Sequence, residues 1–237
     1  MKIQFIIVGW HYNQKEYYSG LSELEQGNDF IDVFWVCHKE PPQDIKDSFQ
    51  YKVFPNEGLE WGGYQQGVDY LKPDDDTIMF LMHDDLIIKS WEFINKSIEH
   101  IQNGKVVVGN GMNYPVKFHP TEKLSYLFPK DIHFHQNKKF IDYVKDECKD
   151  MFDEPILALT LRGSFLCMLM EDINAVNGFE VIWEVPDPKD IGTFGNIQQQ
   201  MFGYKLTKHF GNNSFVYLSN KYQDSEYIYE MARGKVQ

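Results

Sequence analysis

The sequence predicts an α/β fold of three layers, in which helices cover both faces of a mostly parallel central sheet. Two observations support this prediction. Short apolar runs typical of buried strands alternate with segments of helical periodicity over the first 110 residues, as in parallel sheets with crossover helices. In addition, residues 77–86, TIMFLMHDDL, contain an unbroken apolar run, which is typical of a central strand covered on both faces.

The elements can be assigned in chain order from periodicity and turn residues. Strands are expected at residues 2–8, 31–36, 51–54, 78–82 and 106–108, and helices at residues 14–24, 60–71 and 91–102. Residues 111–138 have no clear secondary structure. In the remainder, strands are expected around residues 161–164 and at 204–207 and 215–218, and helices at 139–152, 191–202 and 221–233.

Composition and charge limit the classes of function. A chain of 237 residues with 43% hydrophobic composition can bury one large core. The net charge of −12 argues against nucleic acid as a main partner, because neutralising a nucleic-acid backbone requires clustered Lys and Arg. No segment reaches the ~20 apolar residues that span a bilayer, and the apolar start is too short for a signal peptide. Three widely spaced cysteines indicate reduced thiols, so we expect a cytoplasmic protein.

Three polar residues follow the apolar run at residues 78–82 directly. His83, Asp84 and Asp85 would lie at the carboxyl end of a central strand, and ligands of open α/β sheets bind at that edge. Carboxylate and imidazole groups held at a strand end are suited to bind a divalent cation. The alternative is an acidic loop that binds no metal.

The predicted helix at residues 60–71 contains three glycines, although each costs ~1 kcal/mol relative to alanine in a helix. Gly63 and Gly67 are four residues apart and therefore share one face of the helix. Two explanations are open. Either the backbone or a ligand of the donor site approaches this face, with Trp61 or Gln66 in contact with the ligand, or the glycines allow tight packing on the sheet.

Two segments match turns of the family-two glycosyltransferases of the GT-A fold. The first expected strand ends in VGWHYNQ, in which Tyr12 and Asn13 match the family's Thr-Tyr-Asn type of turn. The segment NEGLEWGGYQQGVDYL resembles the family's turn and helix near the sugar donor, with Asn56, Gly58 and Gly63 matching.

Two further segments extend this resemblance to about residues 3–220. His83-Asp84-Asp85 takes the place of the family's metal-binding Asp-x-Asp motif. Residues 178–180, Gly-Phe-Glu, resemble the turn that precedes the acceptor site. The presence of His83 instead of aspartate keeps a metal ligand but favours Mn²⁺ over Mg²⁺.

The resemblance implies a single GT-A domain, with a nucleotide-sugar-binding half at residues 1–110 and an acceptor-binding half at residues 111–237. Such an enzyme moves a sugar from a nucleoside diphosphate sugar to a hydroxyl of a carbohydrate or other acceptor. The residues that the resemblance and the strand ends assign to the donor are Trp10, Tyr12, His38, Asn56, Gly58, Trp61, Gly63, Gln66 and Asp84. The ion, Mn²⁺ or Mg²⁺, would be bound by Asp85, His83 and His209.

An inverting transfer also requires a carboxylate that removes the proton of the acceptor hydroxyl. The candidates are Glu184, Asp187 and Asp190. Asp190 is favoured because it precedes the expected helix at residues 191–202, as the family's layout implies. A solvated Pro-Asp loop is the alternative for each of the three.

Two departures from the family keep other functions open. Besides the altered metal motif, the aspartate that holds the nucleotide base after the second strand has no counterpart in residues 37–40, CHKE. One alternative is therefore a catalytically silent domain that binds sugar or protein. Another is a metal-dependent hydrolase or nucleotidyltransferase. A dehydrogenase is disfavoured, because no G-x-G-x-x-G follows the first strand.

Overall fold

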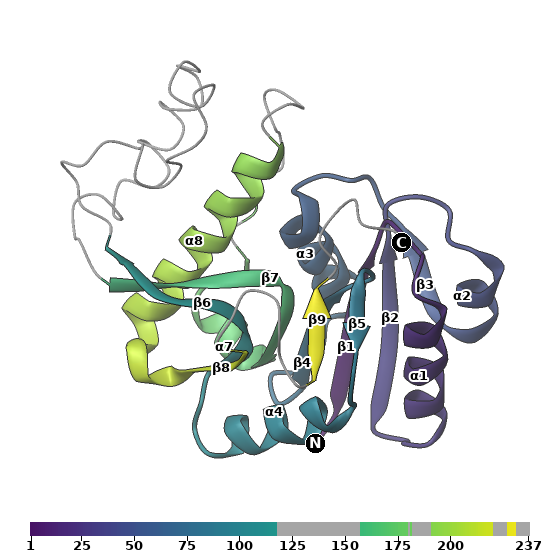
Figure 1. Ribbon diagram of the computed structural model, residues 1–237, viewed down its shortest axis with the longest axis horizontal. Helices are drawn as coiled ribbons and strands as arrows, with labels where there is room; N and C mark the ends of the chain where they lie inside the picture. The colour runs from purple at the N-terminus through teal and green to yellow at the C-terminus, as the bar shows by residue number, and fades with distance from the viewer. Residues whose placement is uncertain (118–156, 180, 182–190, 220–226, 231–237) are drawn as a thin grey trace.

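The computed structural model describes residues 1–117, 157–179, 181, 191–219 and 227–230, which form two sheets and the helices around them (Figure 1). The strands are β1 (Ile3–Gly9), β2 (Ile31–Cys37), β3 (Gln50–Val53), β4 (Ile78–His83), β5 (Leu86–Ile88), β6 (Val107–Lys117), β7 (Leu157–Leu169), β8 (Phe215–Ser219) and β9 (Ile228–Glu230). The helices are α1 (Lys15–Gln26), α2 (Gln43–Ser48), α3 (Leu59–Leu71), α4 (Glu92–Gln102), α7 (Met170–Ala175) and α8 (Ile191–Phe210), with a 3-10 turn at Asn212–Ser214.

The main sheet has seven strands in the order β3-β2-β1-β4-β7-β6-β8. Its neighbouring strands are parallel except at β7, which is antiparallel to both β4 and β6. Val8 of β1 pairs with Val36 of β2 on one side and with His83 of β4 on the other. The carboxyl ends of these three strands therefore meet at one edge. The short strands β5 and β9 form a separate antiparallel pair.

Alternate side chains of β1 enter two different cores. Phe5 and Ile7 are buried in one core with side chains of α1, α2 and α4, whereas Ile6 and Val8 are buried in the other with side chains of α3, α7 and α8. This alternation follows from the two-residue period of a strand. The predicted fold class, α/β with a mostly parallel sheet covered on both faces, is confirmed.

The glycines of α3 allow the helix to lie close to β1. A Cβ atom at Gly67 would lie 2.8 Å from Ile6 Cγ2, and one at Gly63 would lie 2.8 Å from Val8 Cγ2. Both distances are shorter than real Cβ contacts allow. The structure therefore supports tight helix–sheet packing as the reason for these glycines, in preference to close approach of a ligand.

Residues 204–207, predicted as a strand, belong to α8 instead. Phe202 and Leu206 are four residues apart and are both fully buried in the second core. This helical stripe of apolar side chains outweighs the strand propensity of Tyr204 and Thr207.

Two further assignments differ at the borders of the described ranges. The helix predicted at residues 221–233 is wrong at Ile228–Glu230, which form β9 and pair with β5. Residues 111–117, for which no element was expected, continue β6. The helix predicted at residues 139–152 lies outside the described residues.

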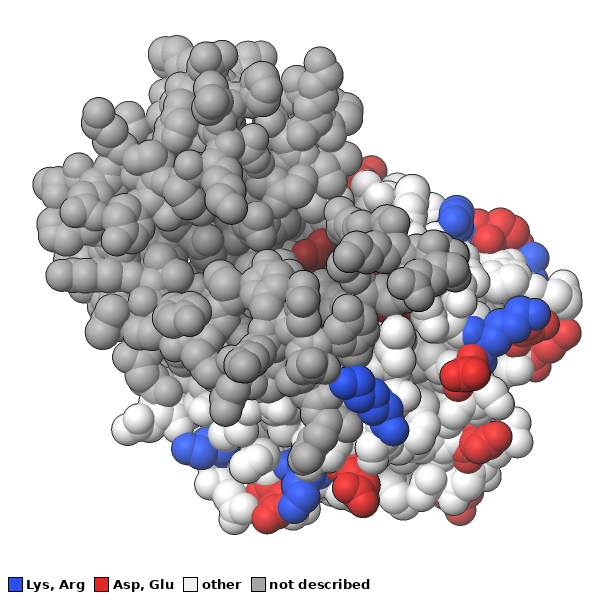
Figure 2. All heavy atoms as spheres, in the orientation of Figure 1, with Lys and Arg blue, Asp and Glu red and all other residues white. Residues whose placement is uncertain are grey.

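The surface shown in Figure 2 carries both signs of charge. Lys and Arg side chains lie among Asp and Glu side chains on the described part of this face, and they do not gather into a basic patch there. No helix in the described ranges combines the length and apolar character needed to cross a membrane.

Candidate active site

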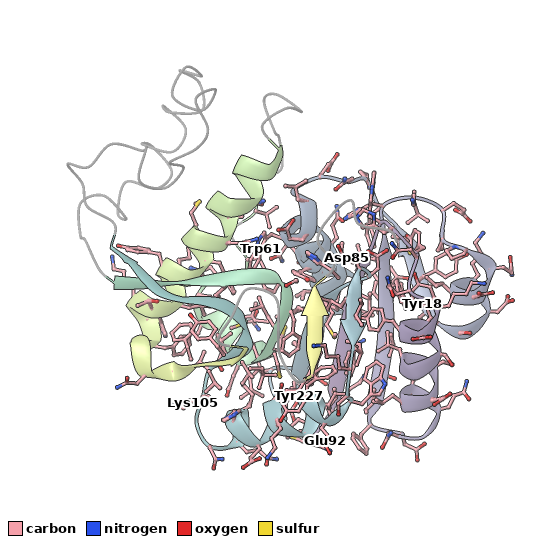
Figure 3. All side chains as sticks on the ribbon, viewed as in Figure 1. Tyr18, Trp61, Asp85, Glu92, Lys105 and Tyr227 are labelled. Carbon is pink, nitrogen blue, oxygen red and sulfur yellow. The ribbon has the colours of Figure 1, made fainter. Side chains whose placement is uncertain are left out.

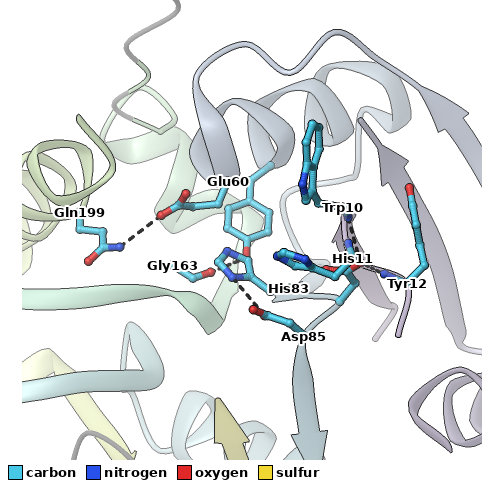
Figure 4. Close-up of polar contacts among 10 residues, drawn as sticks. Trp10, His11, Tyr12, Glu60, His83, Asp85, Gly163 and Gln199 are labelled. Atoms are coloured by element: carbon cyan, nitrogen blue, oxygen red, sulfur yellow. Dashed lines mark hydrogen bonds and ion pairs between the residues drawn. The ribbon is translucent and has the colours of Figure 1, made fainter. Parts of the chain in front are cut away.

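Asp84 fixes the loop that follows β1. Its Oδ2 atom accepts hydrogen bonds from the backbone N–H groups of Trp10, His11 and Tyr12, at 2.9, 2.6 and 2.7 Å (Figure 4). The residue is only 2% exposed. Burial raises the pKa of this carboxyl, and the bonds from the backbone N–H groups partly oppose that shift. Asp84 thus connects the end of β4 to the end of β1.

His83 and Asp85 flank Asp84 and are more accessible. Their side chains are 19% and 14% exposed, and His83 Nδ1 lies 3.8 Å from Asp85 Oδ1 (Figure 4). The His83 ring stacks on the Tyr64 ring of α3, with 6.2 Å between the centroids. His83 Nε2 and Asp85 Oδ1 have no hydrogen-bond partner within the described residues, although both atoms are buried. Buried polar atoms of this kind are costly unless a ligand or water binds them.

A pocket of about 300 Å³ lies beside these side chains. It is situated at the carboxyl ends of β1, β2 and β4, at the end of the sheet opposite to Glu92 and Lys105 (Figure 3). The described residues that line it are Val8, Trp10, His11, His38, Asn56, Leu59, Glu60, His83, Asp84 and Asp85. This set contains three carboxylates and three imidazoles but no Lys or Arg.

Trp10 and His38 form the side of the pocket that follows β1 and β2. Trp10 is 43% exposed, and its ring centroid lies 6.4 Å from that of His38. Lys39 Nζ lies 5.7 Å from the centroid of the Trp10 ring. Burial lowers the pKa of His38, which favours the neutral imidazole. An exposed aromatic face beside a neutral imidazole suits a planar heterocyclic ring.

Glu60 lines the pocket from α3 and was missed by the sequence-based prediction. Its Oε1 atom accepts a hydrogen bond from Gln199 Nε2 of α8 at 3.2 Å. One turn further along α3, the Tyr64 hydroxyl donates a hydrogen bond to the Gly163 carbonyl of β7 (Figure 4). The sequence did contain a signal for Glu60. The residue follows the turn at residues 56–58, so it lies in the first turn of a helix that begins at the same edge of the sheet as Asp85.

The structure brings together some of the residues predicted to bind the donor. Trp10, His38, Asn56 and Asp84 line the pocket. The other five, which are Tyr12, Gly58, Trp61, Gly63 and Gln66, are not among its lining residues.

Three of these five have other contacts. Trp61 is 0% exposed, and its ring packs on those of Phe179 and Phe202, so the predicted contact between Trp61 and the donor is not supported. The Tyr12 hydroxyl lies within donating distance of the carbonyl groups of Gly9 and Lys39, at 3.1 and 3.2 Å. Gln66 Nε2 donates to the Pro55 carbonyl at 3.2 Å.

His209, predicted as a third metal ligand, lies away from His83. It is exposed in the last turn of α8, and its charge acts on Asp172 of α7. Helix α7 follows Leu169, which pairs with Ile78 at the beginning of β4. His209 is therefore near the end of β4 opposite to His83, and the structure does not bring these two histidines together.

The remaining predictions depend on residues that the structure does not describe. Glu184, Asp187 and Asp190, the candidates for the general base, lie outside the described residues. In the described part of the chain, no cluster of three or more His, Cys, Asp or Glu side chains is arranged to hold a metal ion. Of the three residues predicted as metal ligands, His83 and Asp85 lie side by side at the pocket.

No protein-family model and no curated protein matches this chain. Among solved structures, residues 1–349 of TarS from S. aureus match at 14% identity and a TM-score of 0.48, over 97% of this chain and 60% of that chain. Glucosyl-3-phosphoglycerate synthase from Mycobacterium tuberculosis, in complex with Mn²⁺, UDP and glucosyl-3-phosphoglycerate, matches at 9% identity and a TM-score of 0.48, over 91% of this chain and 69% of that chain.

A third match is the galactosyltransferase LgtC in complex with donor and acceptor sugar analogues, at 6% identity and a TM-score of 0.39, over 91% of this chain and 73% of that chain. The chain thus spans 60 to 73% of the length of these three structures. At such identities the similarity concerns the fold alone. At these identities and TM-scores, the matches assign neither a family nor an activity to this chain.

Proposed function

We propose that this chain is a metal-dependent glycosyltransferase, which moves a sugar from a nucleoside diphosphate sugar to an acceptor hydroxyl. The observation that supports this proposal most is the pair of buried atoms His83 Nε2 and Asp85 Oδ1, which lack hydrogen-bond partners among the described residues. Both side chains line the pocket at the carboxyl edge of the sheet, where open α/β sheets bind their ligands.

The charge of the pocket is a reason for a bound cation. A diphosphate would enter a pocket whose described lining includes Glu60, Asp84 and Asp85 but no Lys or Arg. A nitrogen and a carboxylate oxygen fit Mn²⁺, and cations at nucleotide sites commonly have few protein ligands, with phosphate oxygens and water completing the shell. The pair His83 and Asp85 therefore fits such an ion, which would stabilise the charge on the leaving diphosphate.

We assign other residues to the binding of the nucleotide base and to the activation of the acceptor hydroxyl. The exposed face of Trp10 and the neutral ring of His38 are suited to contact the nucleotide base. We retain Asp190, with Asp187 and Glu184, as candidates for the group that removes the proton of the acceptor hydroxyl. A carboxylate with an ordinary pKa of ~4 is ionised at neutral pH, so this role requires only correct placement.

Thermal unfolding with nucleoside diphosphates tests the proposal. UDP, GDP, CDP and dTDP are each added with MnCl₂ or with EDTA. At least one is expected to raise Tm by about 5–10 °C at 100 times its Kd, with Mn²⁺ present. Asp85→Asn should abolish the effect of Mn²⁺, whereas Asp76→Asn, a matched change of an exposed aspartate in the loop before β4, should retain it.

The proposal fails if no diphosphate stabilises the protein in a metal-dependent manner. For a diphosphate that does bind, incubation of the corresponding sugar nucleotides with the protein distinguishes a transferase from a domain that only binds sugar. Release of the diphosphate over time is expected for the enzyme.

A further inference from the structure

Glu60 lines the pocket that also contains His83 and Asp85, and its carboxylate is directed toward Gln199 (Figure 4). Its only hydrogen bond to another described residue is the one that Oε1 accepts from Gln199 Nε2. A carboxylate has about four acceptor positions on its two oxygens. Acceptor positions of Glu60 are therefore available to a ligand in the pocket.

Close packing determines where this carboxylate lies. A Cβ atom at Gly163 would lie 2.9 Å from Glu60 Cγ, so a larger residue at this position of β7 would require the Glu60 side chain to shift. The Tyr64 hydroxyl donates a hydrogen bond to the Gly163 carbonyl, and the Tyr64 ring stacks on the His83 ring. Contacts with Gln199 of α8 and with Gly163 of β7 thus restrict where the Glu60 side chain of α3 can lie.

We infer that Glu60, positioned by Gln199, binds hydroxyl groups of the sugar carried by the donor. This inference rests on the proposed function. A carboxylate repels a diphosphate, but it accepts strong charge-assisted hydrogen bonds from neutral hydroxyl groups. The pocket then has two chemically distinct parts, a cation site at His83 and Asp85 for the diphosphate and a hydroxyl-binding site at Glu60 for the sugar.

Calorimetric titrations with Mn²⁺ present can separate the two parts. The probes are UDP, GDP, CDP and dTDP, each paired with its glucose or mannose ester. For every variant, the ratio of the diphosphate Kd to the sugar-nucleotide Kd measures the contribution of the sugar. Glu60→Ala is expected to lower this ratio about tenfold or more for the cognate pair, without an increase in the diphosphate Kd.

Two further variants make the test specific. Gln199→Ala should lower the ratio in the same direction but by less, because the Glu60 carboxylate is still present but less well positioned. Glu57→Ala removes an exposed carboxylate three residues away that does not line the pocket, and it should leave the ratio unchanged. Both Kd values of a ratio come from the same variant. A general loss of stability would therefore affect both values alike and would not change their ratio.

The outcomes distinguish this inference from the proposed function. If no diphosphate binds to the unchanged protein with Mn²⁺, the proposed function fails and the inference fails with it. If a diphosphate binds but no sugar nucleotide does, only the inference is overturned. The inference alone is also overturned if Glu60→Ala leaves the ratio unchanged, or if it weakens the binding of diphosphate and of sugar nucleotide equally.

Discussion

Asp84 and Asp85 are neighbours in the sequence but differ in their surroundings. Asp84 is buried and accepts hydrogen bonds from three backbone N–H groups, whereas Asp85 Oδ1 has no hydrogen-bond partner among the described residues. Both residues lie in the turn between β4 and β5. One carboxylate therefore holds the site together, and the other is available to a ligand.

Replacement of Asp84 by alanine is expected to destabilise the protein. The substitution removes the carboxylate oxygen that accepts hydrogen bonds from the backbone N–H groups of Trp10, His11 and Tyr12. We expect a loss of about 2–4 kcal/mol in the free energy of unfolding, since water can satisfy part of these groups. Urea unfolding of the variant and the unchanged protein measures this loss, and a change below about 0.5 kcal/mol would contradict the structural role of Asp84.

Asp84→Asn is the matched control, because it keeps an acceptor oxygen without the charge. The pKa of Asp84 is raised in the folded protein, so the folded state binds the proton more tightly than the unfolded state. The resulting stabilisation is complete below the ordinary value of 3.8 and is lost as the pH rises through the folded pKa. The stability of the unchanged protein relative to Asp84→Asn should therefore decrease with rising pH. A constant difference would mean that this pKa is not raised.

At the scale of elements, α3 determines the shape of the site. Its first turn carries Glu60, Tyr64 stacks on His83, and Gly63 and Gly67 allow the helix to contact β1 closely. The distance between helix and sheet thus fixes how far the Glu60 carboxylate lies from the strand ends. Changes on the buried face of this helix should affect stability and ligand binding together.

Gly67→Ala tests the packing of α3. Alanine favours a helix by ~1 kcal/mol over glycine, but the new Cβ atom would lie 2.8 Å from Ile6 Cγ2 and 3.1 Å from Val36 Cγ2. Overpacking is expected to dominate, with a net loss of about 1–3 kcal/mol in urea unfolding. Asp69→Ala, on the exposed face of the same helix, is the control and should change stability by no more than about 0.5 kcal/mol. A gain in stability for Gly67→Ala would show that the helix can move away from β1.

At the scale of the whole molecule, the end of the chain supports the segment that follows Asp85. Strand β5 begins at Leu86 and pairs with β9, in which Ile228 is 2% exposed. The backbone N–H groups of Lys89 and Ser90 donate to the Tyr227 carbonyl. A segment near the carboxyl terminus thus fixes the chain directly after the proposed cation ligands.

Ile228→Ala is expected to lower the free energy of unfolding by about 2–5 kcal/mol, because it leaves a cavity beside β5. Ile87→Ala is the control, since Ile87 belongs to the same strand pair but is 37% exposed, and its replacement should cost less. Urea unfolding measures the loss of free energy of unfolding for each variant. If the two variants lose equal stability, β9 does not cover the core as described.

The elements of the first half could be predicted because their signals are local. The apolar run at residues 78–82 and the β-branched and aromatic residues of β1 identify strands without knowledge of their partners. The pairing of β4 with β7 was not predicted, because it joins Ile78 to Leu169, and no local pattern specifies such a distant contact. The division into halves at residue 110 stays a prediction, although strands from both halves share the main sheet.

The residues of the site that lie at the ends of strands could be predicted from the sequence. His83, Asp85, Trp10 and His38 follow three strands, and the structure places them around one pocket. The role of Asp84 was not predictable, because its partners are backbone N–H groups of a loop more than 70 residues earlier. Trp61 was assigned to the donor from its position beside the glycines, but the side chain turns into the core, where its large apolar surface is removed from water.

The antiparallel strand β7 also has a consequence for synthesis of the chain. The ribosome produces β1 to β4 first, and until β7 follows, one side of β4 has no strand to pair with. An apolar strand with an unpaired edge readily pairs with other chains. During this interval, the strand that delivers His83 and Asp85 is exposed to aggregation, so yield in the cell should depend on how promptly the second half is translated and joined to the first.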